Sequence, residues 1–193
     1  QPTWSSDDGG VYDFDGVDDY FTAAHDTSMD IAGIESTIMS WIYLDATAGN
    51  YSIQAKGGGS AGGWWMFALN DGGVYKLNLA VKQAGTGANH YGMKSDTTLS
   101  TGAWHHVSIN LDMTGTTVAT MHIDGAPVAT TVTTTPTGSY GDSTEDYSAG
   151  TRAILGNYMD GEIDDLRLYV SGLTDAQIGA IYTNTAPTYG ISP

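Results

Sequence analysis

The chain has 193 residues, only six Lys and Arg, no Cys and a net charge of −16. This length suits one domain that buries its core without cross-links. The negative field would repel nucleic acids and anionic membranes and attract cations, and no apolar stretch approaches the roughly 18 residues that a membrane-inserted helix needs.

The first fifty residues predict short strands separated by turns that contain Gly and Asp. Residues 1–9 are expected to form an N-terminal arm, and residues 11–14 alternate as a strand before the turn at 15–19. Residues 26–31 suit one helical turn. Residues 37–44 are apolar on both faces, which indicates a central strand that is covered on both sides.

The middle of the chain continues the pattern of short alternating strands. The Asp71-Gly72 pair between two apolar runs predicts a hairpin. A glycine-rich loop spans 57–63, and residues 133–150 have no core pattern, which in a compact domain indicates a functional or mobile loop. The expected strands of this part are 50–56, 64–69, 74–81, 104–111, 118–123 and 127–132.

The last part of the chain predicts a strand followed by one short helix. Leu166 and Leu168 alternate with Arg167, as in a half-buried strand. Thr174 and Gln177 form a capping-box pattern, and we expect a helix over 175–182. Many short strands and a single helix predict an all-β antiparallel sandwich or barrel, with a tail over 184–193.

Three stretches together resemble laminin-G-like domains of the concanavalin A-like lectin/glucanase superfamily. They are 14–20, then 102–107 with 122–125, and finally 161–169 with 173–178. They stand in the same order and at fitting distances. The resemblance implies that residues 10–183 form a two-sheet jelly roll, often calcium-bearing, which binds sugars or proteins or builds extracellular surfaces.

The resembling strands also predict the core. We expect inward-facing side chains at these positions, and truncation of a buried one, as in Leu166→Ala, should cost roughly 2–5 kcal/mol. The predicted core residues are Trp104, Val107, Ile109, Ile123, Ile163, Leu166 and Leu168.

Four carboxylates within seven residues crowd the first turn. Such a group repels itself unless a cation relieves it, and calcium takes six to eight oxygen ligands. The resemblance implies that the first strand and the acidic closing strand meet at one ion. Asp15 and Asp164 are the expected ligands, with Asp18 and Glu162 as second choices. The alternative is that these are solvated turn residues.

Aromatic residues near the glycine-rich loop could form a platform on which a sugar ring stacks. Because neighbouring residues of a strand face opposite ways, at most one tryptophan of the Trp64-Trp65 pair is available, and core packing is the alternative. The candidate ligand-binding residues are Trp64, Tyr91, Tyr140 and Tyr147.

Signals for other chemistry are weak. His105 and His106 are adjacent on a strand and therefore point apart, which disfavours a shared zinc ion. With three Glu in the chain, no strand carries the carboxylate pair that a glycosidase needs.

We therefore expect a non-catalytic, calcium-stabilised recognition module for a glycan or a protein surface in an extracellular setting. The alternative is a structural or decoration protein of a virion, filament or cell surface, in contact with other subunits. The Gln1-Pro2 start without Met suggests a processed or excised chain and suits that alternative. A glycoside-active enzyme is disfavoured.

Overall fold

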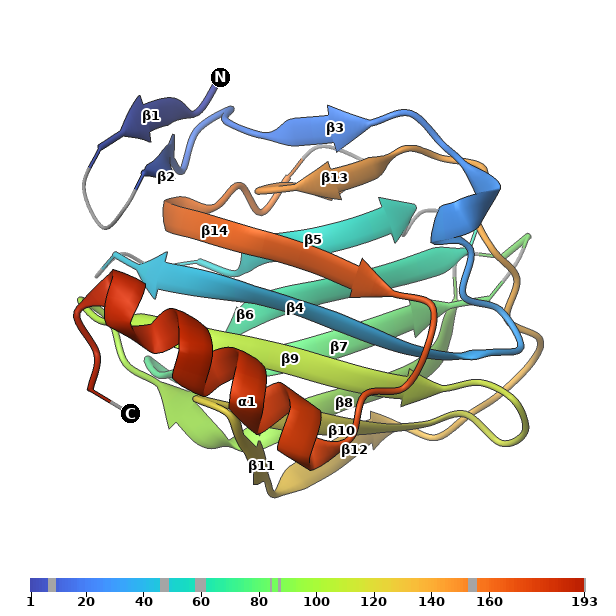
Figure 1. Ribbon diagram of the computed structural model, residues 1–193. Coiled ribbons are helices and arrows are strands. Elements are labelled where there is room, and N and C mark those ends of the chain that lie inside the picture. The colour runs from blue at the N-terminus through green and yellow to red at the C-terminus, as the bar shows by residue number, and fades with distance from the viewer. Residues whose placement is uncertain are drawn as a thin grey trace.

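The computed structural model describes residues 1–6, 10–45, 49–57, 62–83, 85–86, 88–152 and 156–192, which form two stacked antiparallel sheets and one C-terminal helix (Figure 1). Sheet A contains, in spatial order, β1 (Thr3–Ser5), β2 (Val11–Asp15), β14 (Asp160–Tyr169), β4 (Glu35–Leu44), β9 (Trp104–Asp112), β10 (Val118–Ile123) and β11 (Ala126–Val128). Sheet B contains β12 (Thr130–Thr134), β8 (Asn89–Leu99), β7 (Tyr75–Lys82), β6 (Gly63–Asn70), β5 (Tyr51–Gly57), β13 (Tyr147–Ala149) and β3 (Phe21–Ala23). The expected all-β jelly-roll sandwich is confirmed.

Several strands differ from the expectation. β1 lies in the expected N-terminal arm 1–9, and β13 lies in the expected loop 133–150. The expected strand over 127–132 is divided at Ala129, because β11 belongs to sheet A and β12 to sheet B. β8 has no counterpart among the expected strands. Its buried Tyr91 and Met93 alternate with polar or small residues, a short signal in a mostly polar segment.

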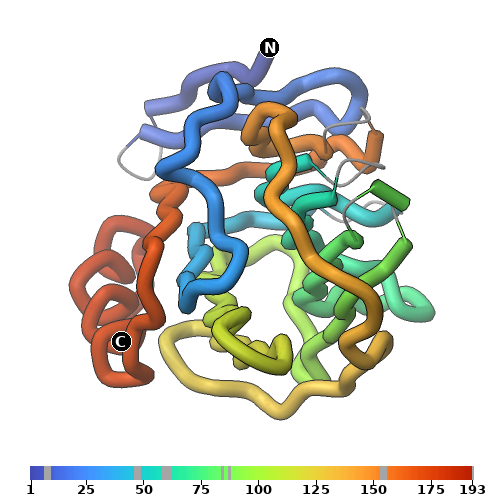
Figure 2. Tube along the Cα trace, turned by 90° about the vertical axis from the view of Figure 1, so that its right-hand side faces the viewer, coloured from blue at the N-terminus to red at the C-terminus, as the bar shows by residue number. Residues whose placement is uncertain are grey.

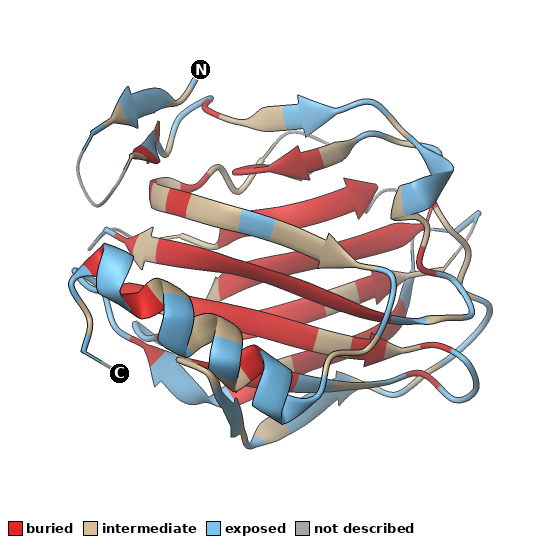
Figure 3. Cartoon of the chain, viewed as in Figure 1, coloured by how far each residue is buried: buried red, intermediate tan, exposed pale blue. Residues whose placement is uncertain are grey.

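The main core lies between the two sheets, where the strands are mostly buried (Figure 3). Sheet A contributes residues such as Ile38 and Ile42, and sheet B contributes Trp64 and Met66, all four with no exposed surface. Burial in this core is confirmed for Val107, Ile109, Ile123 and Ile163, and Leu168 packs partly against it. Trp104 is buried too, but on the opposite face of sheet A, beside Tyr189.

The prediction for Leu166 is wrong, because a β-bulge interrupts β14. Asp164 pairs with Trp41 and Arg167 with Met39, so β14 contains one residue more than β4 between these pairs. Asp165 takes up the extra length with a φ of 49°. Alternation therefore restarts after the bulge, and Leu166 is left 37% exposed.

Helix α1 (Asp175–Thr185) lies against the outer surface of sheet A (Figures 1 and 2). Its capping box between Thr174 and Gln177 is formed as expected. A 3₁₀ turn, η3 (Ala186–Tyr189), follows, and a second one, η2 (Thr27–Met29), lies in the expected helical turn. Within the described residues, no helix is long and apolar enough to cross a membrane.

The chain before β13 is tied down by buried charge. Lys56 is 1% exposed, and its ammonium donates to Asp30 Oδ1 at 2.7 Å and to the Ser143 carbonyl at 2.5 Å. The Asp142 carboxylate accepts hydrogen bonds from the backbone N–H groups of Ile31 and Ala32. The segment 133–150, expected as a functional or mobile loop, is thus fixed beside sheet B at Asp142 and Ser143, and it includes the end of β12 and the whole of β13.

Candidate functional site

The outer face of sheet A is covered by the chain's own C-terminal segment. The Trp41 ring lies 4.3 Å from the Tyr189 ring and 5.7 Å from the Tyr182 ring, centroid to centroid. Its Nε1 donates to Thr185 Oγ1 at 2.9 Å. This face is therefore used for internal packing, under α1 and η3.

Two histidines, His106 and His122, lie in the same interface between sheet A and α1. Burial under the helix lowers the pKa of His106 to about 4, and His122 Nε2 lies 2.9 Å from the Asp175 carboxylate at the start of α1. His105 instead contacts Ser100 and the Asp124 carboxylate. The three histidines thus have separate partners, an arrangement that gives no shared zinc site.

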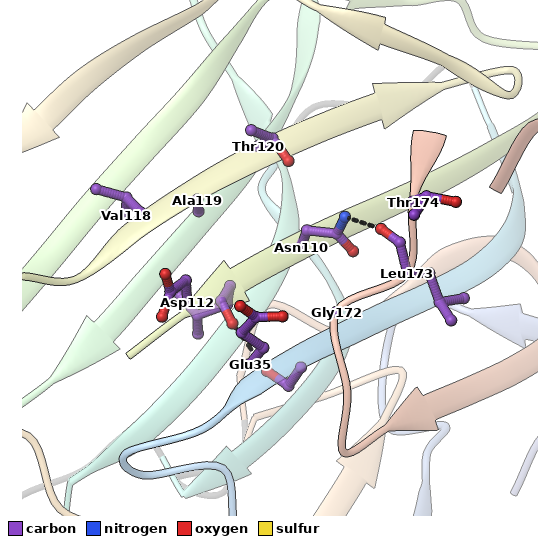
Figure 4. A pocket seen from close by; sticks show the side chains of 11 residues that line it. Glu35, Asn110, Asp112, Val118, Ala119, Thr120, Gly172, Leu173 and Thr174 are labelled. Atoms are coloured by element: carbon purple, nitrogen blue, oxygen red, sulfur yellow. Dashed lines mark hydrogen bonds between the residues drawn. The ribbon is translucent and has the colours of Figure 1, made fainter. Parts of the chain in front are cut away.

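A hollow of about 280 Å³ on sheet A lies between β4, β9, β10 and the segment that leads into α1 (Figure 4). Glu35 and Asp112 are directly opposite each other there. Two of the hollow's polar side chains already have partners. Asn110 Nδ2 donates to the Leu173 carbonyl at 2.6 Å, and Asp112 Oδ1 accepts two hydrogen bonds from Thr114. The hollow marks where the C-terminal segment is attached.

The outer face of sheet B is different, because no helix of the described chain covers it. One row of outward positions crosses the sheet, and apart from Trp65 its side chains are small. We call this row the sheet B face. From β3 to β8 it consists of Thr22, Ser148, Ala55, Trp65, Ala80 and Gly92.

Trp65 is held rigidly in the middle of this face. Its ring stacks on the Phe67 ring at 3.8 Å, with an angle of 15° between the planes. Its Nε1 donates to Ser52 Oγ at 3.0 Å. The Arg152 guanidinium carbon lies 4.8 Å from the centre of the Trp65 ring, so a cation rests on the aromatic surface.

Four of the six basic residues gather on this side of sheet B. Lys94 and Lys76 both pair with the Asp71 carboxylate, at 2.7 and 3.7 Å. Lys82 donates to the neutral Asn89 amide oxygen at 2.6 Å. Within the described part of the chain, neither Lys82 nor Arg152 forms an ion pair with a carboxylate.

A polar pocket of about 580 Å³ adjoins the sheet B face at the edge made by β3 and β13. Two buried atoms among its lining residues, Arg152 Nε and Glu145 Oε2, have no hydrogen-bond partner among the residues that the structure describes. Buried polar atoms normally have partners, so these two are open to a polar ligand or to water. The lining residues of this polar pocket are Tyr20, Thr22, Glu145, Asp146, Ser148, Thr151 and Arg152.

The crowded acidic turn after β2 brings oxygen ligands together. Ligand atoms of Asp15, Asp18 and Asp19 all lie within 4.8 Å of one another. Asp15 Oδ1 accepts hydrogen bonds from the N–H groups of Val17 and Asp18, and the first of these bonds contributes most to lowering the pKa of Asp15. Asp19 is 6% exposed, accepts from the Asp15 N–H, and has its Oδ1 2.7 Å from the Gln1 nitrogen.

The strand register decides which acidic residues of β14 lie near this turn. Asp160 pairs with Asp15, and Gly16 approaches so closely that a side chain there would meet the Asp160 Cβ at 2.9 Å. Asp164 lies four residues further, about 13 Å along the strand. Its carboxylate accepts a hydrogen bond from Tyr189 at 2.7 Å.

Comparison with known proteins gives the family. The profile described as the concanavalin A-like lectin/glucanases superfamily, Laminin_G_3, matches residues 15–179. The chain belongs to this superfamily. No curated protein matches it in sequence.

Three solved structures similar to this superfamily member are 12–14% identical to it, so they show a common fold. Domain 4 of AbnA, an extracellular arabinanase from Geobacillus stearothermophilus, in complex with arabinotriose, has a TM-score of 0.66 at 14% identity, with 94% of this chain and 81% of that chain covered. The CBM40 of the Ruminococcus gnavus IT-sialidase, bound to α2,3-sialyllactose, has a TM-score of 0.61 at 13% identity, with 87% and 96% covered.

The receptor-binding domain of botulinum neurotoxin type G has a TM-score of 0.69 at 12% identity. The alignment covers 98% of this chain but 47% of the toxin domain. This superfamily fold therefore corresponds to about half of that domain.

In this superfamily domain, two of the predicted aromatic ligand residues, Trp64 and Tyr91, lie inside the sandwich, and Tyr140 and Tyr147 are half-buried against its core. Trp64 has no exposed surface, and Tyr91 is 3% exposed with its hydroxyl on Met93 Sδ. Tyr140 and Tyr147 donate to Asp142 and Gln54, and burial raises the pKa of both phenols. Alternation along β6 makes Trp65, rather than Trp64, the tryptophan on the outer face.

The predicted metal ligands are divided between two places. Asp15 and Asp18 lie in the acidic turn, and Glu162 pairs with Asp13 on the adjacent strand. The structure does not bring Asp164 to them. Asp19, which is not among the expected ligands, belongs to the cluster. Asp160 is the β14 residue opposite Asp15, a position that only the pairing of β2 with β14 reveals.

Proposed function

We propose that this chain is a non-catalytic binding module that takes a glycan on the sheet B face. The observation that carries the proposal is the contrast between the two outer faces. Sheet A is covered by α1 and η3, whereas on the sheet B face small side chains surround Trp65, which is 7% exposed, and a polar pocket with unpaired polar atoms among its described lining residues adjoins them. Small residues leave room for a sugar ring, and hydroxyl and carboxylate groups suit its hydroxyls.

The similar structures support a glycan rather than a protein surface as the ligand. Two of them are described as complexes with arabinotriose or sialyllactose, on domains of the same fold. Fold similarity alone leaves the ligand open, so the sheet B face itself is the main support. An extracellular or cell-surface setting is part of this proposal, in keeping with the acid-rich composition.

We also propose that calcium is a structural cofactor at the acidic turn. The donor set fits, because Asp15, Asp18 and Asp19 offer carboxylate oxygens close together. Asp13 supports this proposal as well. Burial and then the charges of neighbouring aspartates raise its pKa, which indicates uncompensated negative charge. Calcium would supply the positive charge that compensates these aspartates. It would also hold the turn that leads to Tyr20 and Thr22 of the polar pocket.

A non-catalytic role is supported by how the carboxylates are arranged. Glycoside hydrolysis needs two carboxyl groups that flank one bond, with separate acid and base or nucleophile roles. At the Glu35–Asp112 pair, hydrogen bonds from Thr114 lower the pKa of Asp112, which disfavours a role as proton donor. Glu145 and Asp146 of the polar pocket are neighbours in sequence, just before β13, so they come from the same side of the pocket and do not flank a bond from two sides.

A glycan panel with two matched variants tests the proposal. Intrinsic tryptophan fluorescence and calorimetry would follow titration with arabinotriose, lactose, sialyllactose and trigalacturonate. Ala80→Gln places a longer side chain next to Trp65 and should abolish binding. Val118→Gln, an equally polar change at an exposed position of the sheet A hollow, should leave binding unchanged.

Two results would contradict the proposal. If no glycan binds the wild-type protein, the chain has another type of ligand, such as a protein surface. If Val118→Gln abolishes binding and Ala80→Gln does not, the site lies on sheet A.

A further inference from the structure

The charge distribution around Trp65 narrows the class of ligand. The chain has 22 Asp and Glu against six Lys and Arg, so a cation has many carboxylates to pair with. Lys56, Lys76, Lys94 and Arg167 do pair with one. In the described part of the chain, the two basic residues that pair with no carboxylate are Lys82 and Arg152, and both are near Trp65. Their lack of partners is therefore local and concentrated at one place on the sheet B face.

The positive charges of Lys82 and Arg152 lie close enough to repel each other. Lys82 lies on the same face as Trp65, diagonally across from it in the pairing of β6 with β7. Burial lowers the pKa of Lys82, and the nearby Arg152 charge lowers it further. Each of these positive charges disfavours the charged form of the other, and an anion between them would stabilise both charged forms.

Arg152 has the geometry to hold such an anion. Its guanidinium carbon lies 4.8 Å from the centre of the Trp65 ring, and its buried Nε has no partner among the described residues. Guanidinium groups bind carboxylates through two parallel hydrogen bonds, and these are stronger than neutral hydrogen bonds. A carboxylate would satisfy the donor that the protein leaves unpaired.

The surroundings exclude a heavily charged ligand. Glu145 and Asp146 line the same polar pocket, and the net charge of −16 repels polyanions. The other lining residues, Tyr20, Thr22 and Thr151, carry hydroxyl groups. This combination suits one carboxylate on a ring with many hydroxyls, whose O–H groups can donate to Glu145.

We propose that Arg152 and Lys82 form a subsite for the carboxylate of an acidic sugar, with the sugar hydroxyls in the polar pocket. The inference rests on the proposed function, because it names the ligand class of the sheet B face. The carboxylate could come from a uronic acid or from a sialic acid, and the two sources share this recognition chemistry.

The test compares acidic sugars with their neutral counterparts. Calorimetry would measure trigalacturonate against trigalactose, and sialyllactose against lactose, with the wild-type protein and three variants. Arg152→Gln and Lys82→Gln remove the proposed contacts. Lys76→Gln is the matched control, since it removes a cation from the same side of sheet B that already pairs with Asp71.

We expect the wild-type protein to bind the acidic member of at least one pair about tenfold more tightly, the scale of one charge-assisted hydrogen bond. Arg152→Gln and Lys82→Gln should each reduce that preference several-fold while binding of the neutral sugar is retained. Lys76→Gln should retain the preference, and added salt should weaken it.

The outcomes separate this inference from the proposed function. Equal binding of acidic and neutral sugars would overturn the subsite and leave the glycan-binding role intact. A preference that survives both Arg152→Gln and Lys82→Gln would also overturn the subsite. If no sugar binds, acidic or neutral, the proposed function fails and the subsite fails with it.

Discussion

The two outer faces of the sandwich each carry a central tryptophan in a stack, but the stacks are completed differently. Trp41 on sheet A is stacked on Tyr182 and Tyr189 of the C-terminal segment, and its Nε1 bonds to Thr185. Trp65 on sheet B stacks on Phe67 from its own strand and is covered by Arg152. The same residue type thus joins parts of the fold on one face and supports an unpaired cation on the other.

This difference separates stability from recognition. The sheet A face buries aromatic rings and histidines against α1, and changes there should affect folding. The cations near Trp65 lack carboxylate partners, so changes to them should affect binding with little effect on folding. The predictions below test that separation, in order of decreasing effect.

The largest effect is expected for Trp41→Ala, which removes a fully buried ring from under η3. Loss of such a ring costs about 3–5 kcal/mol of unfolding free energy. Arg152→Gln on the other face should cost no more than about 2 kcal/mol, the scale of one partly desolvated cation–π contact. Urea denaturation of both variants checks this. Equal destabilisation by the two changes would contradict the separation.

Lowering the pH should reduce the free energy of unfolding, because His106 in the sheet A face becomes protonated. Burial lowers its pKa from 6.5 to about 4, so the folded state binds a proton less readily than the unfolded state. The neutral imidazole therefore contributes stability above pH 6.5, and this is lost as the pH falls from 6.5 to 4, by up to about 1.4 kcal/mol per unit. His106→Gln should flatten this slope in denaturation measured between pH 7 and 4. An unchanged slope would place the acid sensitivity elsewhere.

Calcium should stabilise the edge that joins the acidic turn to the polar pocket. An ion that binds only the folded state adds about 2.7 kcal/mol at a hundred times its dissociation constant. Chelation should therefore lower the melting temperature, and Asp19→Asn should remove the response. Asp96→Asn, an exposed acidic position on β8, is the control and should keep it. A melting curve that neither chelator nor added calcium shifts would rule out the ion.

The smallest effect is expected at the bulge of β14. Leu166 is 37% exposed, so Leu166→Ala should cost less than about 1 kcal/mol, instead of the 2–5 kcal/mol expected for a buried leucine. Ile163→Ala, before the bulge and 2% exposed, should cost the larger amount. Parallel thermal denaturation of the two variants tests whether the alternation restarts after Asp165.

The sequence by itself determined the features that depend on local pattern. Alternation of apolar and polar residues indicated most of the strands, and the Thr174–Gln177 capping box placed the single helix. The same alternation identified Val107, Ile109 and Ile163 as core. These features follow from the side-chain period of a strand or helix, which neighbouring residues express without reference to the rest of the fold.

Only the tertiary structure decided which side of each strand faces inward and which residues meet. Shifting a strand by one residue exchanges its faces, so alternation along β6 left open whether Trp64 or Trp65 points outward. The pairing of β2 with β14 brought Asp160 rather than Asp164 to Asp15, and a bulge exposed Leu166. The gathering of Lys82 and Arg152 near Trp65 joins β7, β6 and the segment after β13, which lie far apart in sequence, so no local pattern could show it.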